Sequence, residues 1–232
     1  MNVPQELLDF DRQATLTLNG STSLFWDDLM MTVTNTWAWS LPIIVLIYLI
    51  IKNNKLKEAF TILITIGVMI FVADRICSGI VKPTVARWRP TQDPEIMYLV
   101  DVVSNYRGGR FGFFSGHACN TFCMSTFLSL LFRSTKMTFT LFFWSITTTF
   151  TRLYLGVHYL GDVTVGLLCG LLIGFLFYLI YFFIRRRFGK AHLISGQFTT
   201  TGYLHTDIDK FMTTIFLNYN LVLILSLTRG IV

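Results

Sequence analysis

Residues 160–184 read LGDVTVGLLCGLLIGFLFYLIYFFI, and this stretch decides the fold class. Its apolar side chains form a nearly continuous run, without the 3.6-residue period of a helix that buries only one face. A helix that is apolar on every side needs an apolar surrounding, and about 20 such residues cross the hydrocarbon core of a bilayer. The stretch therefore predicts a membrane-spanning helix.

The composition of the whole chain agrees with this prediction. Of 232 residues, 53% are hydrophobic, 16% aromatic and only 14% charged, which argues against a soluble fold. We predict an all-α, integral membrane helical bundle of about six transmembrane helices in a single domain over residues 1–232. The other predicted spans are 31–51, 59–81, 113–132, 137–155 and 211–228. The predicted parts are an interfacial segment (1–30), a five-span core (31–184), a cytoplasmic loop (185–210) and the sixth span (211–232).

The N-terminal segment differs from the spans. Residues 5–30 alternate apolar and polar positions, which predicts an amphipathic helix or helix pair lying in the membrane interface. No basic region precedes an apolar core in residues 1–6, so a cleavable signal peptide is not expected. The cysteines all fall in predicted spans and are expected to be packing residues, not disulfides or metal ligands. They are Cys77, Cys119, Cys123 and Cys169.

Basic residues in the short loops predict the orientation. The loops after the first, third and fifth spans are basic and are therefore placed in the cytoplasm. Their cations are Lys52, Lys55, Lys57, Arg133, Lys136, Arg185, Arg186, Arg187 and Lys190. The net charge of +6 is accordingly read as membrane anchoring, with no nucleic acid and no obligate protein partner expected. The opposite side is nearly as rich in cations, so those cations need another role.

Three segments fall on that opposite side under this topology. They read KPTVARWRP at 82–90, FSGH at 114–117 and TRLYLGVHYLGD at 151–162. The first follows the second span, the second opens the third span, and the last joins the fourth and fifth spans. We therefore expect the three segments to form one site.

The residue types in these segments suit phosphoryl transfer, which requires positioned cations and N–H donors around the charge of the phosphoryl group. Lys82, Arg89 and Arg152 supply cations. A helix over the first segment would place Lys82 and Arg89 on one face, two turns apart, although its prolines disfavour a helix. Ser115 and Gly116 enter a helix, where backbone N–H groups favour an anion, and each is predicted to hold one phosphate oxygen.

Two histidines supply the reactive groups. His158 and Asp162 are spaced i, i+4, so the carboxylate is predicted to fix one imidazole tautomer and raise the nucleophilicity of the other nitrogen. His117 lies beside the predicted oxygen cradle and is the candidate general acid for the leaving oxygen.

These segments resemble the three-part signature of the type 2 phosphatidic acid phosphatase superfamily, in its membrane-bound bacterial lipid phosphatase branch. That signature reads Lys-x6-Arg-Pro, Pro-Ser-Gly-His and Ser-Arg-x5-His-x3-Asp. Phe114 stands in place of Pro and Thr151 in place of Ser, and neither change removes a chemical group. The match covers residues 82–162 and keeps all internal spacings, which is far more specific than one short motif.

The resemblance implies an activity and a role for each residue. His158 would form a phosphohistidine, Asp162 would orient it and His117 would be the acid, with no metal or cofactor. The phosphate would be held by Lys82, Arg89, Ser115, Gly116 and Arg152. The implied substrate is a phosphorylated lipid at the periplasmic face of a bacterial inner membrane: undecaprenyl pyrophosphate, lipid A, phosphatidylglycerophosphate or phosphatidic acid.

Three other functions are alternatives: a vanadium-dependent haloperoxidase-like activity, a non-enzymatic lipid-binding or transport protein, and a metal-dependent phosphatase. Secondary site residues are also predicted. Asp74 and Arg75, at the outer end of the second span, are expected to form a mutual ion pair or to support Lys82. Arg107 and Arg110 lie in a flexible outer turn or contact the head group or a second phosphate. Arg87 falls between the motif positions and is expected to be an interfacial anchor.

Overall fold

The computed structural model describes residues 4–186 and 196–229, and every named element in them is helical. This confirms the prediction of an all-α protein. The α-helices are α1 (Gln5–Leu18), α2 (Leu24–Thr34), α3 (Ser40–Asn53), α4 (Leu56–Asp74), α5 (Lys82–Val85), α6 (Gly116–Phe132), α7 (Thr135–Tyr154), α8 (Leu160–Arg186) and α9 (His205–Arg229). A π-helical stretch, Arg75–Val81, joins α4 to α5, and short 3-10 turns occupy Thr36–Trp39, Pro90–Gln92 and Val103–Asn105.

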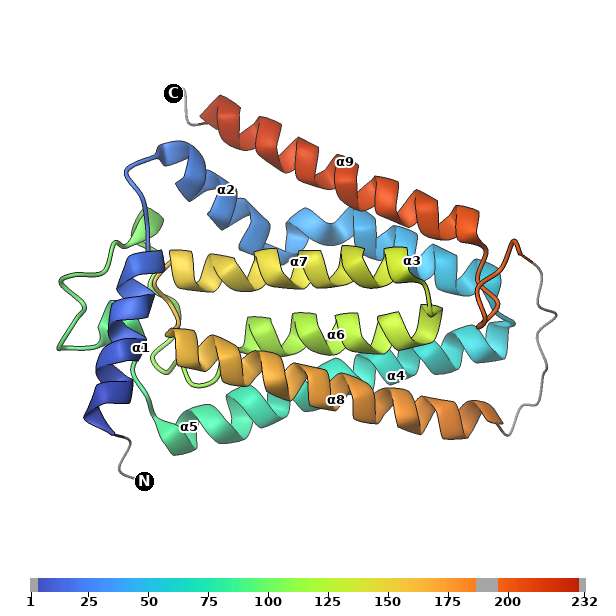
Figure 1. The fold of residues 1–232 in the computed structure, drawn as a ribbon, viewed down its shortest axis with the longest axis horizontal. Coiled ribbons are helices and arrows are strands. Elements are labelled where there is room, and N and C mark those ends of the chain that lie inside the picture. The colour runs from blue at the N-terminus through green and yellow to red at the C-terminus, as the bar shows by residue number, and fades with distance from the viewer. Residues whose placement is uncertain (1–3, 187–195, 230–232) are drawn as a thin grey trace.

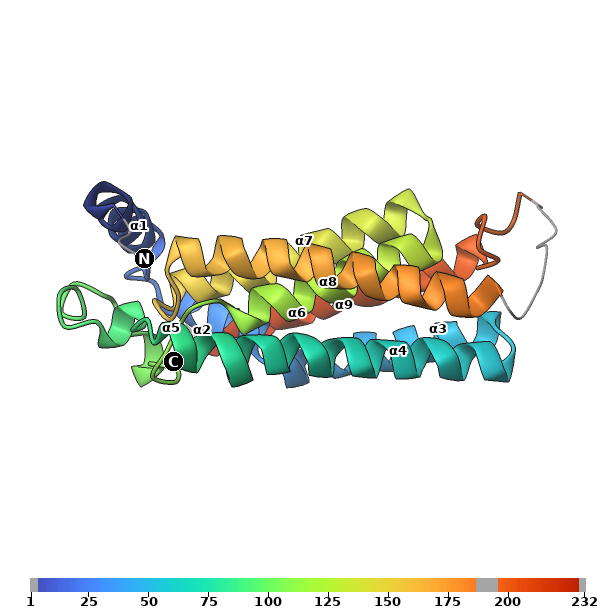
Figure 2. The ribbon, with the colours of Figure 1, turned by 90° about the horizontal axis from the view of Figure 1, so that it is seen from below.

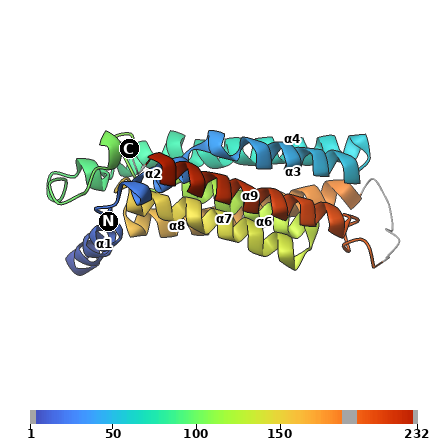
Figure 3. The ribbon, with the colours of Figure 1, turned by 90° about the horizontal axis from the view of Figure 1, so that it is seen from above.

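The long helices run along one common axis (Figure 1). The views from below and from above, each turned by 90° from Figure 1, show α3 and α4 in one layer and α6, α7 and α8 in another (Figures 2 and 3). The centre of the bundle is α6, which contacts α4, α7 and α8. The turns from α3 to α4 and from α6 to α7 lie at one end, and the three motif segments lie at the other. The prediction that the motifs share one end of the bundle is therefore confirmed.

Glycines let α8 approach α6 closely. A Cβ added at Gly166, Gly170 or Gly174 would overlap a backbone carbonyl oxygen of α6 or of its N-cap residue Ser115. Such small residues, one turn apart on one face, allow two helix backbones to pack together in a membrane protein. Because Gly166 meets the carbonyl of Ser115, this packing fixes the N-terminal ends of α6 and α8 relative to each other.

Four helical segments in the described chain are long and apolar enough to cross a membrane, and the protein is an integral membrane protein. They are Thr36–Asn53, Leu56–Val85, Leu160–Arg185 and His205–Thr228. The predicted spans 113–132 and 137–155 are also helices, α6 and α7, but they do not belong to this set. The α6 helix has only 17 residues, and α7 is rich in threonine.

Two predicted boundaries are wrong. The span 31–51 is not one helix, because α2 continues to Thr34 and the Asn35 side chain then accepts a hydrogen bond from the Trp37 N–H (3.0 Å), which starts a new turn. Only α1 lies across the end of the bundle (Figure 1), whereas α2 packs against α7 and α9. The predicted loop 185–210 is shortened because α9 begins at His205. Arg187 and Lys190 of that loop lie outside the described residues.

The cysteines are free, as predicted. Cys77, Cys119 and Cys123 are buried and Cys169 is partly buried. The Cys77 thiol donates to the Phe114 carbonyl (3.2 Å), so it ties the π-helical stretch after α4 to the segment that enters α6.

Candidate active site

The cations of the first motif approach each other through a loop, not along a helix. The helix that carries Lys82 ends at Val85, because Ala86 adopts a left-handed conformation and Arg89 is extended. Lys82 and Arg89 are therefore not on one helical face. They still lie within electrostatic reach of each other and of Arg152 from α7.

Arg89 holds the histidine of the third motif. Its Nη1 donates to the Val157 carbonyl oxygen (2.9 Å) and lies 3.1 Å from Nε2 of His158, and both side chains are buried. A guanidinium has donors and no acceptor, so Nε2 must accept with its lone pair. In a neutral ring, the proton is then on Nδ1. This is the tautomer that a nucleophilic Nε2 requires.

Asp162 lies on the other side of the imidazole ring. Its Oδ2 is 3.5 Å from Nδ1 of His158, longer than an ordinary hydrogen bond, and the Asp162 side chain is fully buried. The backbone N–H of Tyr159 donates to the same oxygen (3.1 Å). The carboxylate is thus positioned to stabilise a positive charge that develops on the ring.

The surroundings of His158 keep the imidazole neutral. Burial, and then the charges of Arg89, Arg152 and Lys82, hold the pKa of His158 well below its ordinary value of 6.5, against an opposing contribution from the Gly112 backbone. The Nε2 lone pair is therefore available at neutral pH.

This depressed pKa predicts the pH dependence of stability. Unfolded His158 gains a proton below about pH 6.5, whereas folded His158 does not, so its contribution to the free energy of unfolding falls as the pH decreases through that range. The limiting slope is about 1.4 kcal/mol per pH unit. Wild-type protein should lose thermal stability between pH 7.5 and 5 more steeply than His158→Asn. Parallel melting curves for the two proteins over this range would contradict the expectation.

Arg152 is buried on α7 and donates to the Thr34 hydroxyl (Nη1, 2.6 Å) and to the Tyr106 hydroxyl (Nη2, 3.1 Å). The Nε–H groups of Arg89 and Arg152 are buried and have no hydrogen-bond partner among the described residues. Each guanidinium therefore retains a donor for an anion, as phosphate binding requires.

The start of α6 brings the second motif to these groups. The Ser115 hydroxyl caps α6 by accepting from the Ala118 N–H (3.4 Å), and the Ser115 N–H donates to the Asp162 carbonyl (2.9 Å). The Ser115 N–H is therefore engaged within the protein, and the hold of Ser115 on a phosphate oxygen, for which its hydroxyl is left, stays a prediction. A Cβ at Gly116 would lie 3.9 Å from Nζ of Lys82, so the ammonium approaches this turn. His117 lies within electrostatic reach of Arg152, His158, Lys82 and Arg89.

The predicted secondary residues have separate contacts. Asp74 accepts from Ser78 (3.1 Å) and lies within electrostatic reach of Lys82, and Arg75 stacks on Phe71 (5.1 Å). Among the described residues no ion pair joins Asp74 to Arg75, so the support of Lys82 is the surviving alternative.

The two arginines of the outer turn also differ. Arg107 and Thr91 exchange hydrogen bonds: Nη1 donates to the Thr91 carbonyl (2.8 Å), and the Thr91 hydroxyl donates to the Arg107 carbonyl (2.9 Å). This exchange gives Arg107 a structural role in the turn. Arg110 stacks on Trp88 (4.9 Å) and Phe111 (5.1 Å) at the exposed rim.

The prediction that Arg87 is an interfacial anchor is wrong. Its Nη1 donates to Oδ1 of Asp162 (2.8 Å), and its Nη2 donates to Asp11 of α1 (2.6 Å). The spacing of Arg87 from Arg89 could have indicated this place in the site. In an extended segment residues i and i+2 lie on one side, so the two arginines point the same way. Asp11 had no such signal, since it lies 76 residues from Arg87 in the sequence.

Gly112 lies against the His158–Asp162 pair and gives a matched test of the predicted site. An added Cβ there would be 2.8 Å from Oδ2 of Asp162 and 3.7 Å from Nδ1 of His158, whereas one at Gly109 meets nothing within 4 Å. Gly112→Ala should lower kcat/KM by about 10-fold or more, because displacement of catalytic groups by about 1 Å is costly. Gly109→Ala should retain wild-type kcat/KM. Equal rates for both variants in a phosphate-release assay would refute this placement.

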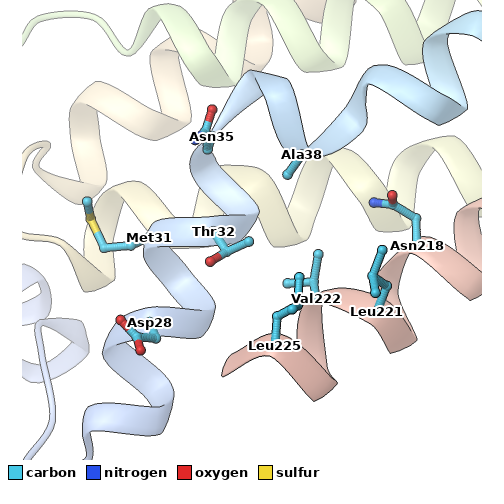
Figure 4. Close-up of a pocket in the computed structure, with 9 residues that line it drawn as sticks. All are labelled: Asp28, Met31, Thr32, Asn35, Ala38, Asn218, Leu221, Val222 and Leu225. Carbon is cyan, nitrogen blue, oxygen red and sulfur yellow. The ribbon is translucent and has the colours of Figure 1, made fainter. Parts of the chain in front are cut away.

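A separate pocket lies between α2 and α9 (Figure 4). Residues of both helices and of the turn between α2 and α3 line it: Asp28, Met31, Thr32, Asn35, Ala38, Asn218, Leu221, Val222 and Leu225. None of these lining residues belongs to the three motifs.

Comparison with known proteins identifies the family. The model of the PAP2 superfamily matches residues 59–186. A lipid A 4'-phosphatase of Bacteroides thetaiotaomicron is 40% identical over 176 residues, which is 75% of this chain and 78% of the relative. A lipid A 4'-phosphatase of Porphyromonas gingivalis is 32% identical over 183 residues, which is 78% of this chain and 77% of the relative. No solved structure matches the chain. The resemblance drawn from the three motifs is thus confirmed: the chain belongs to the PAP2 superfamily and is a lipid phosphatase of the PAP2 type.

Proposed function

We propose that this protein hydrolyses a phosphate monoester of lipid A through a phosphohistidine on His158. The observation that carries the proposal is the geometry of His158, whose Nε2 bears the lone pair beside Arg89 while Nδ1 faces Asp162. The names of the two relatives support lipid A as the substrate.

The chemistry follows from these positions. A phosphate dianion replaces Nε2 as the partner of Arg89, and Arg152 and Lys82 balance its charge. Nε2 then attacks phosphorus, the ester P–O bond breaks, and His117 gives its proton to the leaving sugar oxygen. Asp162 stabilises the resulting imidazolium.

The second half of the reaction restores the enzyme. Water loses a proton to His117 and attacks phosphorus, the P–N bond breaks, and inorganic phosphate leaves. Every group in both steps belongs to the protein, the lipid or water. Lys82, Arg89 and Arg152 serve both steps because the phosphoryl group stays in place while the attacking atom changes.

The proposal includes the membrane arrangement. The α6 and α7 helices join the four long apolar segments to give six spans, and the basic turns at the opposite end of the bundle face the cytoplasm. The active site then faces the periplasm of a bacterial inner membrane, and α1 lies in the interface beside it.

The alternative functions are less well supported. Four long apolar segments disfavour a soluble haloperoxidase-like enzyme. The convergence of Arg89, His158 and Asp162 disfavours a non-enzymatic lipid-binding or transport protein. A metal-dependent phosphatase would lose its activity in chelator.

The test is a substrate panel with purified protein in detergent containing a chelator. The panel contains bis-phosphorylated lipid A, undecaprenyl pyrophosphate, phosphatidic acid and phosphatidylglycerophosphate, with His158→Ala as the blank. Loss of the 4'-phosphate, located by fragment masses, is expected to be fastest. Phosphate release from another lipid, with lipid A unchanged, would overturn lipid A as the substrate. Activity that is lost only when the chelator is present would overturn the metal-free chemistry.

A further inference from the structure

Asp11 is a buried carboxylate on α1, far in sequence from every motif. Its Oδ2 accepts from Nη2 of Arg87 (2.6 Å), and its Oδ1 accepts from the backbone N–H of Gly161 (2.7 Å). Next to it on α1, the Thr15 hydroxyl accepts from the Leu160 N–H (3.0 Å). The first N–H groups of a helix lack partners within the helix, so α1 supplies the missing cap of α8.

Arg87 connects this helix to the catalytic pair. Its other terminal nitrogen, Nη1, donates to Oδ1 of Asp162 (2.8 Å), and its guanidinium lies 4.0 Å from the ring centre of Tyr159. The remaining oxygen of Asp162, Oδ2, faces Nδ1 of His158. Four side chains therefore form one continuous series from α1 to the nucleophile.

The charge of Asp162 depends on Arg87, and the placement of Arg87 depends on Asp11. The side chain of Asp162 is 0% exposed, and a buried carboxylate keeps its charge only beside a compensating cation. Arg87 is that cation, but it comes from the loop after α5. A planar guanidinium held at one nitrogen still rotates, whereas Asp11 fixes the second nitrogen and with it the plane.

We propose that Asp11 is a positioning residue, which acts through Arg87 to hold Asp162 in register with His158. The inference rests on the proposed phosphohistidine chemistry. It makes the N-terminal helix part of the catalytic assembly, although α1 touches no reacting atom.

Asp11→Asn separates the two contacts of this residue. The Asn oxygen still accepts from the Gly161 N–H, whereas its amide nitrogen has no acceptor for Nη2 of Arg87. We expect kcat to fall by about 10-fold to 100-fold with KM changed by less than about 2-fold, because the substrate contacts stay in place. Asp11→Glu should recover part of kcat. The matched control is Asp9→Asn on the exposed side of α1, which should retain wild-type kcat.

A double-mutant cycle tests the path through Arg87. The rate is measured by single turnover with excess enzyme. In an Arg87→Gln background, adding Asp11→Asn should lower this rate by less than a further factor of about 2. The same loss in both backgrounds would show that Asp11 only anchors α1, and would overturn the proposal. Rates are normalised to the monodisperse folded fraction, so a folding defect is not read as a catalytic one.

The cycle is run on whichever lipid the wild type hydrolyses. A wild-type rate equal to that of His158→Ala would refute the proposed function itself. Wild-type activity that depends on His158, together with equal rates for Asp11→Asn and Asp9→Asn, would refute only the role of Asp11.

Discussion

Replacing His158 with alanine is expected to lower phosphate release by about 10³-fold or more, the largest loss of any single substitution in this chain. The variant lacks the proposed nucleophile, while the cations that we propose bind the phosphate remain: Arg89, Arg152 and Lys82. KM should therefore change much less than kcat. His205→Ala is the matched control, because His205 is an exposed histidine at the start of α9, on the other end of the bundle.

A trapping experiment distinguishes the covalent route from direct attack by water. Wild-type protein mixed with labelled lipid and quenched in alkali should retain label that is released by acid, as expected for a phosphoramidate. His158→Ala should retain none. A wild-type enzyme that turns over without ever carrying label under single-turnover conditions would favour direct hydrolysis, with His158 as a base.

The second large effect is expected at Arg89. Arg89→Met removes the donor to His158 Nε2 and to the Val157 carbonyl, together with a buried positive charge, and should lower kcat/KM by about 10²-fold to 10³-fold. Arg89→Lys should recover little, because an ammonium cannot reproduce the guanidinium fork. Burial, reinforced by the charge of Arg152, lowers the pKa of Arg89.

Lys136→Met is the control for loss of charge. Lys136 forms an exposed ion pair with Asp209 (2.8 Å) at the opposite end of the bundle, so its removal should leave kcat/KM unchanged. The measurement is phosphate release at several lipid concentrations in mixed micelles. A loss for Lys136→Met as large as that for Arg89→Met would mean that overall charge, not position, controls the rate.

The sequence was sufficient for the parts of the site that depend on short spacings. His158 and Asp162 are four residues apart, and the turn that enters α8 keeps that distance short whatever the rest of the chain does. Helices were likewise predictable, because long apolar runs allow few alternatives. The break at Asn35 was not, since a single side-chain hydrogen bond decides it.

The contacts of Asp11 and Arg87 depend instead on tertiary structure. No periodicity links Asp11 to residues 76 or 150 positions away. The path of residues 86–89 was equally hidden, because no residue in that stretch marks the left-handed conformation of Ala86. The competition of the Asp162 carbonyl for the Ser115 N–H is likewise visible only once α6 and α8 are packed together.

That packing has a consequence for how such enzymes diversify. Because Gly166 meets the Ser115 carbonyl, the N-terminal ends of α6 and α8 pack directly against each other, next to the second motif and to His158. The segment of residues 86–113 is held to these helix ends at several points along its length. The Thr91 N–H donates to the Gly156 carbonyl (3.2 Å), and the Tyr159 hydroxyl donates to Asp93 (2.6 Å). Its exposed side chains, such as Tyr98 and Leu99, are the positions where we expect substitutions to alter the entrance while the reaction centre stays intact. Arg87 and Arg89 of the same segment stay fixed by their contacts with Asp162 and His158, so we expect head-group preference to change through exposed positions beside them.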